Sequence, residues 1–273
     1  MSDETTTKPD EAAQAPAPSS MKMPPHPKAV AMITGASSGI GKALALKFGR
    51  EGYDVAMLAR RPGPLADAAA QVRDYGAEVW EFPVDITDRD AFAKVFDDLL
   101  AKTGGRLDVF VANAGIGPAT PAKAFDLEAA QQTIDLNCSA FVQGIAMAMR
   151  PLRKIGRGHL VAISSLAAFR GIRKSAVYCA SKALESAFME SLRLDLRGTD
   201  IHCLTVHPGY VDTPIHDEKT KKKLPHLVPA ATAADLIYKG IETRANEVNF
   251  PAPLVAMARL GQMLPNALFD RFS

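Results

Sequence analysis

Apolar and polar positions follow two distinct patterns along the chain. Short runs that are apolar almost throughout have the length of β-strands, and they occupy residues 29–34, 54–59, 78–83, 107–112, 159–164 and 201–207. Longer stretches carry apolar residues every three or four positions, as amphipathic helices do, and they occupy residues 40–50, 64–75, 88–103, 133–150 and 175–196. Strands of this kind, each followed by a helix, predict a parallel sheet covered by helices on both faces. We therefore expect an α/β fold with a single doubly wound domain over residues 28–250.

The two ends of the chain differ from this body. Residues 1–27 hold six prolines among small, polar and acidic residues, and their only large apolar side chains are methionines. Such a composition cannot offset the entropy of ordering, so we expect a disordered tail. Residues 251–273 are apolar around most of a helical circumference, which predicts a helical extension of the same domain. We expect this extension to cover the mouth of a substrate site or a partner subunit, with a shallow membrane contact as the alternative.

Composition and charge narrow the class of protein. A net charge of +2 provides no dense basic field of the kind that binds nucleic acid. The three cysteines, Cys138, Cys179 and Cys203, lack the spacing of a metal site, so we expect no metal and a reducing compartment. Acidic residues near the start argue against a secretory signal or a transit peptide, and no run of about 18 apolar residues could span a membrane. These features predict a cytoplasmic protein.

The junction between the first strand and the first helix carries a glycine pattern. Residues 34–41 read Thr-Gly-Ala-Ser-Ser-Gly-Ile-Gly, directly after an apolar strand and at the start of a helix. In a Rossmann-type domain, glycines at such a junction allow a tight turn and a close approach of the backbone to a pyrophosphate, which meets the positive end of the helix. The sequence therefore predicts a dinucleotide-binding site that includes Gly35, Ser37, Ser38, Gly39, Ile40 and Gly41.

The end of the second strand bears on the choice of dinucleotide. An acidic residue there would accept a hydrogen bond from a ribose hydroxyl and favour NAD, but the chain has Ala59 followed by Arg60 and Arg61. Two guanidinium groups suit a 2′-phosphate. We predict that NADP(H) is preferred, while use of NAD(H) and a purely solvated role for the arginine pair stay open.

Three polar side chains point to acid–base chemistry. Tyr178 and Lys182 lie four residues apart in a predicted helix, so the phenol and the ammonium share one helix face. A neighbouring cation favours the phenolate and lowers the pKa of a tyrosine from its usual value of about 10. Ser165 follows the fifth strand, at the carboxyl edge where doubly wound folds bind ligands.

Together, the glycine junction and Ser165, Tyr178 and Lys182 resemble the short-chain dehydrogenase/reductase family in its compact single-domain branch. The resemblance extends from Lys28 to about Pro253. It implies that Asn137 is a fourth catalytic residue. It also implies cofactor contacts by Asp85, Asn113, Gly115, Tyr178, Lys182, Pro208, Gly209 and Thr213.

The resemblance further implies a reaction, which is hydride transfer between NADP(H) and a small molecule carrying a carbonyl or an alcohol. Tyr178 is expected to act as general acid or base, and Ser165 to polarise the carbonyl. Lys182 is expected to lower the Tyr178 pKa, and Asn137 to support a proton relay. A homodimer or homotetramer is the assembly that the resemblance implies. A 3-oxoacyl thioester reductase and a non-catalytic NADP(H)-sensing protein are the alternatives.

The substrate stays open at this point. A lysine-rich run at residues 219–223 and three basic residues between Ser165 and Tyr178 either attract an anionic substrate or lie on solvated surface. These three residues are Arg170, Arg173 and Lys174.

Overall fold

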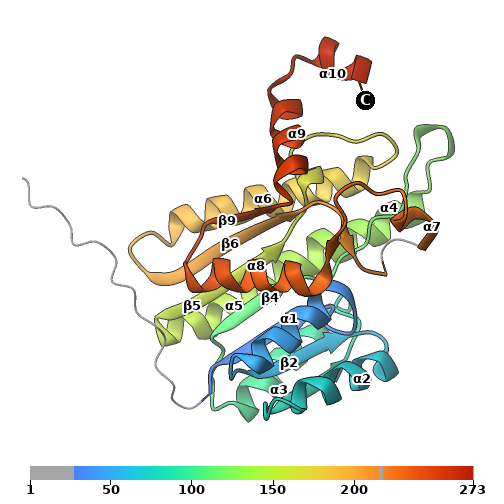
Figure 1. The fold of residues 1–273 in the computed structure, drawn as a ribbon. Helices are drawn as coiled ribbons and strands as arrows, with labels where there is room; N and C mark the ends of the chain where they lie inside the picture. Colours follow the sequence, from blue (N-terminus) through green and yellow to red (C-terminus); the bar gives the residue numbers. More distant parts are fainter. Residues whose placement is uncertain (1–27, 215–217, 273) are drawn as a thin grey trace, which may run out of the picture.

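The computed structural model describes residues 28–214 and 218–272, so the predicted tail of residues 1–27 lies outside the described part. Its main sheet has seven strands, all parallel, in the order β3-β2-β1-β4-β5-β6-β9 (Figure 1). The strands are β1 (Val30–Thr34), β2 (Asp54–Ala59), β3 (Val79–Pro83), β4 (Val109–Ala112), β5 (Arg157–Ile163), β6 (Asp200–Pro208) and β9 (Glu247–Phe250). A small second sheet pairs β7 (Val211–Asp212) with β8 (Val228–Pro229). The prediction of an α/β fold with a parallel, doubly wound sheet is confirmed.

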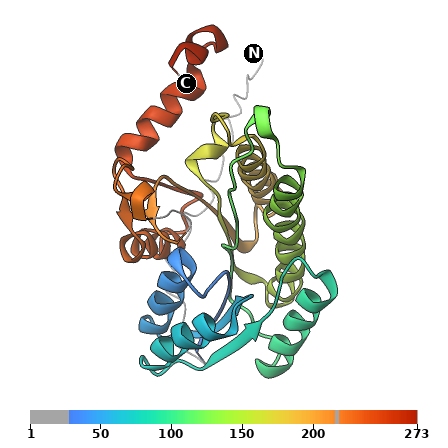
Figure 2. The ribbon, with the colours of Figure 1, turned by 90° about the vertical axis from the view of Figure 1, so that its right-hand side faces the viewer.

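Helices cover both faces of the sheet (Figure 2). The α-helices are α1 (Gly39–Arg50), α2 (Pro62–Arg73), α3 (Arg89–Lys102), α4 (Leu127–Ile134), α5 (Phe141–Ile155), α6 (Ala176–Asp195), α7 (Glu218–Lys221), α8 (Ala230–Glu242), α9 (Ala252–Met263) and α10 (Asn266–Phe272). Short 3₁₀ turns, η1 (Ala122–Ala124) and η3 (Leu166–Ala168), and a π-helical turn, η2 (Asp135–Ala140), complete the described elements.

The alternation of side chains along each strand divides the core into two layers. On β1, Ala31 and Ile33 belong to the layer formed with α1, α2 and α8, whereas Val30 and Met32 belong to the layer formed with α3, α5 and α6. All five residues of β1 are buried, because the strand lies inside the sheet and is covered on both faces. This double coverage explains why the strand is apolar from Val30 to Ile33.

The prediction of one helix over residues 133–150 is wrong in two respects, which are its continuity and the position of its end. The structure divides this segment into α4, the π-helical turn η2 and α5. Proline lacks an N–H group and normally ends a helix, yet α5 continues past Pro151 to Ile155. Pro151 and Leu152 are both buried, so packing against the sheet outweighs the lost hydrogen bond. The helix ends where Gly156 adopts a left-handed conformation, with φ of 84°.

The seventh strand, β9, was not predicted. It has four residues, and the polar Glu247 and Asn249 interrupt its apolar pattern. Its parallel pairing with β6 extends the sheet at one edge. This pairing is a long-range interaction that a short window of sequence does not contain.

The C-terminal helices α9 and α10 project away from the body of the domain (Figure 1). None of the residues of α9 is buried, and Met257, Leu260 and Met263 are 61–82% exposed. Within the described residues, no helix has both the length and the apolar character needed to cross a membrane.

His159 provides a test of the packing between β5 and β6. It is buried near the start of β5, and its ring lies edge-on to that of His202, with 5.8 Å between the centroids. Burial, with smaller contributions from the nearby His202 and Arg244, lowers the pKa of His159 from 6.5 to about 4. Between those two pH values the unfolded chain binds a proton that the folded protein rejects, so stability falls as the pH drops below 6.5.

We expect His159→Gln to remove part of this acid sensitivity. At pH 5 the histidine costs the wild type about 2 kcal/mol relative to pH 7, from 1.36 kcal/mol per pKa unit. The free energy of unfolding, measured with urea at both pH values, should therefore fall by about 2 kcal/mol less in the variant than in the wild type. Equal losses in both proteins would contradict the assignment of a buried neutral His159.

Candidate active site

The carboxyl ends of the central strands surround one large cavity. Because β1, β2, β4, β5 and β6 are parallel, the segments that follow them meet at the same edge of the sheet. The cavity there has a volume of about 1210 Å³. It is lined by fifteen of the residues expected to bind a cofactor and by Ser165. The fifteen are Gly35, Ser37, Ser38, Gly39, Ile40, Arg60, Arg61, Asp85, Asn113, Gly115, Tyr178, Lys182, Pro208, Gly209 and Thr213. Gly41 and Asn137 lie behind its wall.

The glycine turn between β1 and α1 is tightly packed. Gly35 and Gly39 have φ of 69° and 56°, in the left-handed region that disfavours side chains. A Cβ atom on Gly41 would lie 2.4 Å from the Gly35 carbonyl oxygen, so only glycine fits there without a backbone shift. Asn113, at the end of β4, donates from Nδ2 to the Thr34 carbonyl oxygen at 2.8 Å. Its side chain thus fixes the turn to the neighbouring strand.

The first turn of α1 is suited to an anion. It contains no acidic residue, and Ser38 caps the helix in an extended conformation without a side-chain hydrogen bond to the described residues. The first N–H groups of a helix have no partner within it, and with the helix dipole they favour a phosphate. The tight glycine cradle and this helix end therefore fit the pyrophosphate of a dinucleotide.

Arg60 and Asp85 lie together at the far end of the cavity. The Nη1 atom of Arg60 is 3.8 Å from Asp85 Oδ2, and the two side chains are 68% and 45% exposed. Asp85 also accepts hydrogen bonds from the N–H and the hydroxyl of Thr87, at 3.0 and 2.8 Å. A long, exposed ion pair contributes little stability, so Arg60 can turn to a phosphate at small cost.

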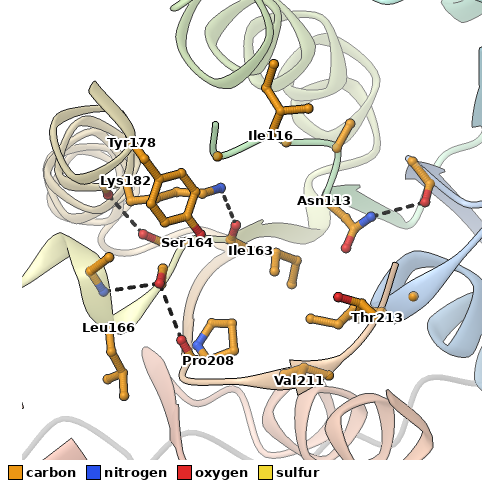
Figure 3. A pocket seen from close by; sticks show the side chains of 18 of the residues that line it. Asn113, Ile116, Ile163, Ser164, Leu166, Tyr178, Lys182, Pro208, Val211 and Thr213 are labelled. Carbon is orange, nitrogen blue, oxygen red and sulfur yellow. Dashed lines mark hydrogen bonds between the residues drawn. The ribbon is translucent and has the colours of Figure 1, made fainter. Parts of the chain in front are cut away.

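Tyr178 and Lys182 project from α6 into the opposite part of the cavity (Figure 3). The Tyr178 ring packs on Gly117, where an added Cβ would lie 2.9 Å from ring atom Cδ2. Ser165 is buried just after β5, and its Oγ accepts a hydrogen bond from the Ala167 N–H at 3.1 Å. The cavity thus brings the hydroxyl groups of Ser165 and Tyr178 and the Lys182 ammonium into one wall. Gly117, which orients the phenol, was not singled out in the sequence.

Lys182 is buried and fully bonded to protein groups. Its Nζ donates to the Ile163 carbonyl oxygen at 2.9 Å and to Oε1 and Oε2 of Glu185 at 2.9 and 3.0 Å. Burial alone would lower the pKa of Lys182, but the Glu185 carboxylate outweighs it and the pKa is raised. Burial raises the pKa of Glu185 against the opposing effect of Lys182. Sequence reasoning missed Glu185, although an acid three residues after Lys182 on a helix was visible.

Asn137 is fully buried in the π-helical turn η2 and braces the loop after β4. Its Oδ1 accepts from the Ile116 N–H at 2.9 Å, and its Nδ2 donates to the Ile116 carbonyl oxygen at 2.8 Å. A further bond from Nδ2 reaches Ser181 Oγ at 3.0 Å. The braced loop includes Gly117, which carries the Tyr178 ring. Asn137 therefore fixes the position of this loop.

Arg170 attaches the C-terminal helices to the mouth of the cavity. Its Nη1 donates to the carbonyl oxygens of Gly261 and Leu264, both at 2.6 Å, and its Nη2 donates to Asn266 Oδ1 at 2.7 Å. The guanidinium also lies 4.0 Å from the centroid of the Phe269 ring. Apolar side chains of the C-terminal helices and of the segment after β5 line the mouth together, and they are Leu166, Phe169, Ile172, Leu254, Met257 and Phe269.

The segment after β6 closes the cavity between its two ends. A Cβ on Gly39 would lie 3.0 Å from Thr213 Cγ2, so this segment touches the glycine turn. A Cβ on Gly209 would lie 2.8 Å from Leu254, so it also touches α9. Further along the chain, Lys221 of the lysine-rich run forms an ion pair with Asp212, with 2.8 Å between Nζ and Oδ1.

Comparisons with known proteins agree with this arrangement. A family model described as short chain dehydrogenase matches residues 29–224. An uncharacterised oxidoreductase of Myxococcus xanthus is 39% identical over 240 residues, which are 88% of this chain and 94% of that protein.

Solved structures agree as well. LigD of a Sphingobium species has a TM-score of 0.77 and 26% identity, with 89% of this chain and 96% of that chain covered. A short-chain dehydrogenase of Sphingobium yanoikuyae, solved in complex with NADPH, has a TM-score of 0.76 and 27% identity, with 88% and 97% covered. The chain therefore belongs to the short-chain dehydrogenase family and is an oxidoreductase of that family.

Proposed function

We propose that this protein is an NADP(H)-dependent oxidoreductase that interconverts a carbonyl and an alcohol. The observation that carries the proposal is a single cavity with two chemically different ends. One end has the glycine turn and Arg60, and the other has Ser165, Tyr178 and Lys182. A phosphate-binding end and an acid–base end within one cavity are what transfer of hydride to a carbonyl requires.

The side chains have distinct roles in the proposed reduction. The cofactor, when bound, supplies a hydride to the carbonyl carbon. Tyr178 donates a proton from its hydroxyl to the carbonyl oxygen. Ser165 donates a hydrogen bond to the same oxygen and stabilises the charge that develops on it. Lys182 stabilises the phenolate form of Tyr178, and Asn137 keeps the loop under the phenol in place.

The preference for NADP(H) rests on Arg60 and Arg61. Both line the cavity directly after β2. The last residue of β2 is Ala59, so the chain has no acidic side chain at that position. The similarity to the Sphingobium yanoikuyae enzyme solved with NADPH supports the same choice. Gly35, Gly39 and Asp85 would hold the rest of the dinucleotide.

The substrate that fits this mouth has an apolar body. Arg170 lines the cavity beside these apolar residues, and it donates hydrogen bonds to backbone carbonyl oxygens and to Asn266. Because its guanidinium is bonded to protein groups, Arg170 does not favour an anionic substrate. A carrier-bound thioester is therefore a poorer match to this site. Aldehydes and ketones with aromatic or aliphatic bodies match the side chains of Phe169, Leu254 and Met257.

Tyr178→Phe tests the acid–base assignment. The variant keeps the ring that packs on Gly117 and loses the proton donor. General acid–base catalysis contributes about 10²- to 10⁴-fold, so kcat for NADPH-dependent reduction should fall by at least about 100-fold. The Kd for NADPH, measured from its fluorescence, should change by less than a few fold. A variant within tenfold of the wild-type kcat would show that another group supplies the proton.

Arg60→Ala tests the choice of cofactor. A charge-assisted hydrogen bond to phosphate contributes about 1.5–3 kcal/mol, or roughly 10- to 150-fold in kcat/KM for NADPH. The value for NADH should stay nearly constant. Arg157→Ala is the matched control, because Arg157 is exposed at the opposite edge of the sheet. Equal losses with both cofactors would make Arg60 a structural residue.

Arg170→Met tests the apolar mouth. Methionine retains bulk but cannot donate to Gly261, Leu264 or Asn266, so the C-terminal helices should lose their attachment. We expect KM for bulky apolar ketones to rise about tenfold, since about 1.4 kcal/mol of lost contact changes affinity by that factor. Activity toward a ketone of three or four carbons should change less. The exposed Arg173→Met is the control, and an unchanged KM in Arg170→Met would remove the C-terminal wall from the substrate site.

A further inference from the structure

Glu185 is a buried acid that the proposed mechanism does not use. It lies on α6 one turn after Lys182 and is 2% exposed. Both of its carboxylate oxygens accept hydrogen bonds from Lys182 Nζ, at 2.9 and 3.0 Å. Acidic side chains are rarely buried this fully unless they have a partner of opposite charge. Glu185 is therefore the ion-pair partner of Lys182, and it lies directly behind the cavity wall.

The three donors of the Lys182 ammonium have fixed partners. An ammonium carries three protons, and here they face the Ile163 carbonyl oxygen and the two oxygens of Glu185. Lys182 is itself 3% exposed, and burial disfavours its charged form. Without a counter-ion a lysine in such a place tends to become neutral. The Glu185 carboxylate reverses this tendency and raises the pKa of Lys182 above 10.5.

The other titratable groups around the pair are few in the described part of the chain. Tyr178, on the same helix, has its ring centroid 5.9 Å from Lys182 Nζ. Cys138, from η2, has a pKa raised by burial and by Glu185. His207, from β6, bonds to Ser186 Oγ at 3.0 Å instead of to the pair. Glu185 is thus the anion that compensates the charge of Lys182.

Stability alone does not account for this pair. Removing two ions from water is costly, and replacing a buried pair with apolar side chains of similar volume is often neutral or stabilising. Apolar residues would also suit α6, which packs against the sheet with Met189 fully buried. A charged pair in this position has an evident use only if the charge of Lys182 is needed in the cavity.

We propose that Glu185 is a positioning residue that keeps Lys182 protonated and oriented behind Tyr178, so that the phenolate form of Tyr178 always faces a cation. The identity of the reaction rests on the proposed function, whereas the charge state of Lys182 does not. Glu185 acts through Lys182 and touches neither substrate nor cofactor.

The first experiment measures the protonation of Lys182 without turnover. The chain is labelled with ¹³C at lysine Cε, and the Lys182 signal is identified by its loss in Lys182→Met. In the wild type the ammonium form should persist beyond pH 10.5, in line with the raised pKa. In Glu185→Gln, which is nearly isosteric, the signal should titrate about two pH units lower or more. Glu190→Gln, an exposed acid on the same helix, is the matched control and should behave as wild type.

The second experiment measures the pH dependence of alcohol oxidation with NADP⁺. Oxidation requires Tyr178 to accept a proton from the alcohol, and the adjacent Lys182 favours this step only while its ammonium is charged. The pH of half-maximal kcat should therefore move upward by about one unit or more in Glu185→Gln. Glu185→Asp keeps the charge but withdraws the carboxylate by one methylene, so it should retain the wild-type midpoint with a several-fold lower kcat.

These outcomes separate the two proposals. An unchanged Lys182 titration in folded Glu185→Gln overturns the role of Glu185, whatever the activity. The expected titration in a wild type that oxidises no alcohol and reduces no carbonyl sinks the proposed function and leaves the pair intact. If circular dichroism shows Glu185→Gln to be unfolded, Glu185→Asp decides: a wild-type kcat there reduces Glu185 to a folding role, and a lowered kcat with the wild-type pH midpoint supports the proposal.

Discussion

The candidate site depends on one constraint, which is that the central strands are parallel and end at the same edge of the sheet. The glycine turn follows β1, Arg60 follows β2, Asn113 follows β4 and Ser165 follows β5, so residues far apart in the chain line one cavity. Strands covered on both faces must be apolar, and the polar chemistry is thereby confined to the segments just beyond them. Hydrogen bonds such as that from Asn113 to the Thr34 carbonyl oxygen then fix these segments to one another.

The two ends of the cavity handle charge differently. The phosphate-binding end is open, and Arg60 is exposed and loosely paired, so water screens its charge. The acid–base end is buried, and Lys182 sits beside a carboxylate in a region of low dielectric. An unpaired charge therefore costs little free energy at the exposed end with Arg60 and much more at the buried end with Lys182. This difference explains why Arg60 has only the distant, exposed Asp85 as its partner, whereas Lys182 is paired closely with the buried Glu185.

Patterns that are local in sequence predicted the fold well. The six apolar runs became strands within two residues at each end, because a doubly covered strand must be apolar whatever its neighbours are. The glycine turn could be predicted equally well, because its glycines are required by local backbone geometry. Gly35 has a positive φ, and a side chain on Gly41 would meet the Gly35 carbonyl oxygen. Long-range effects were not visible. The pairing of β9 with β6, the packing of Gly117 under Tyr178 and the attachment of α9 by Arg170 all depend on residues distant in the chain. Glu185 could have been noticed, but only its burial distinguishes it from an exposed acid such as Glu190.

The central claim is that this cavity transfers a hydride to a carbonyl carbon. The most direct measurement follows a label: the enzyme is incubated with NADPH carrying deuterium at one face of C4 and with a set of apolar aldehydes and ketones, and the alcohols are analysed by mass spectrometry. The account predicts that at least one alcohol gains a single deuterium on its carbinol carbon from one C4 epimer and none from the other. Tight binding of NADPH with no transfer of label to any carbonyl compound would contradict it.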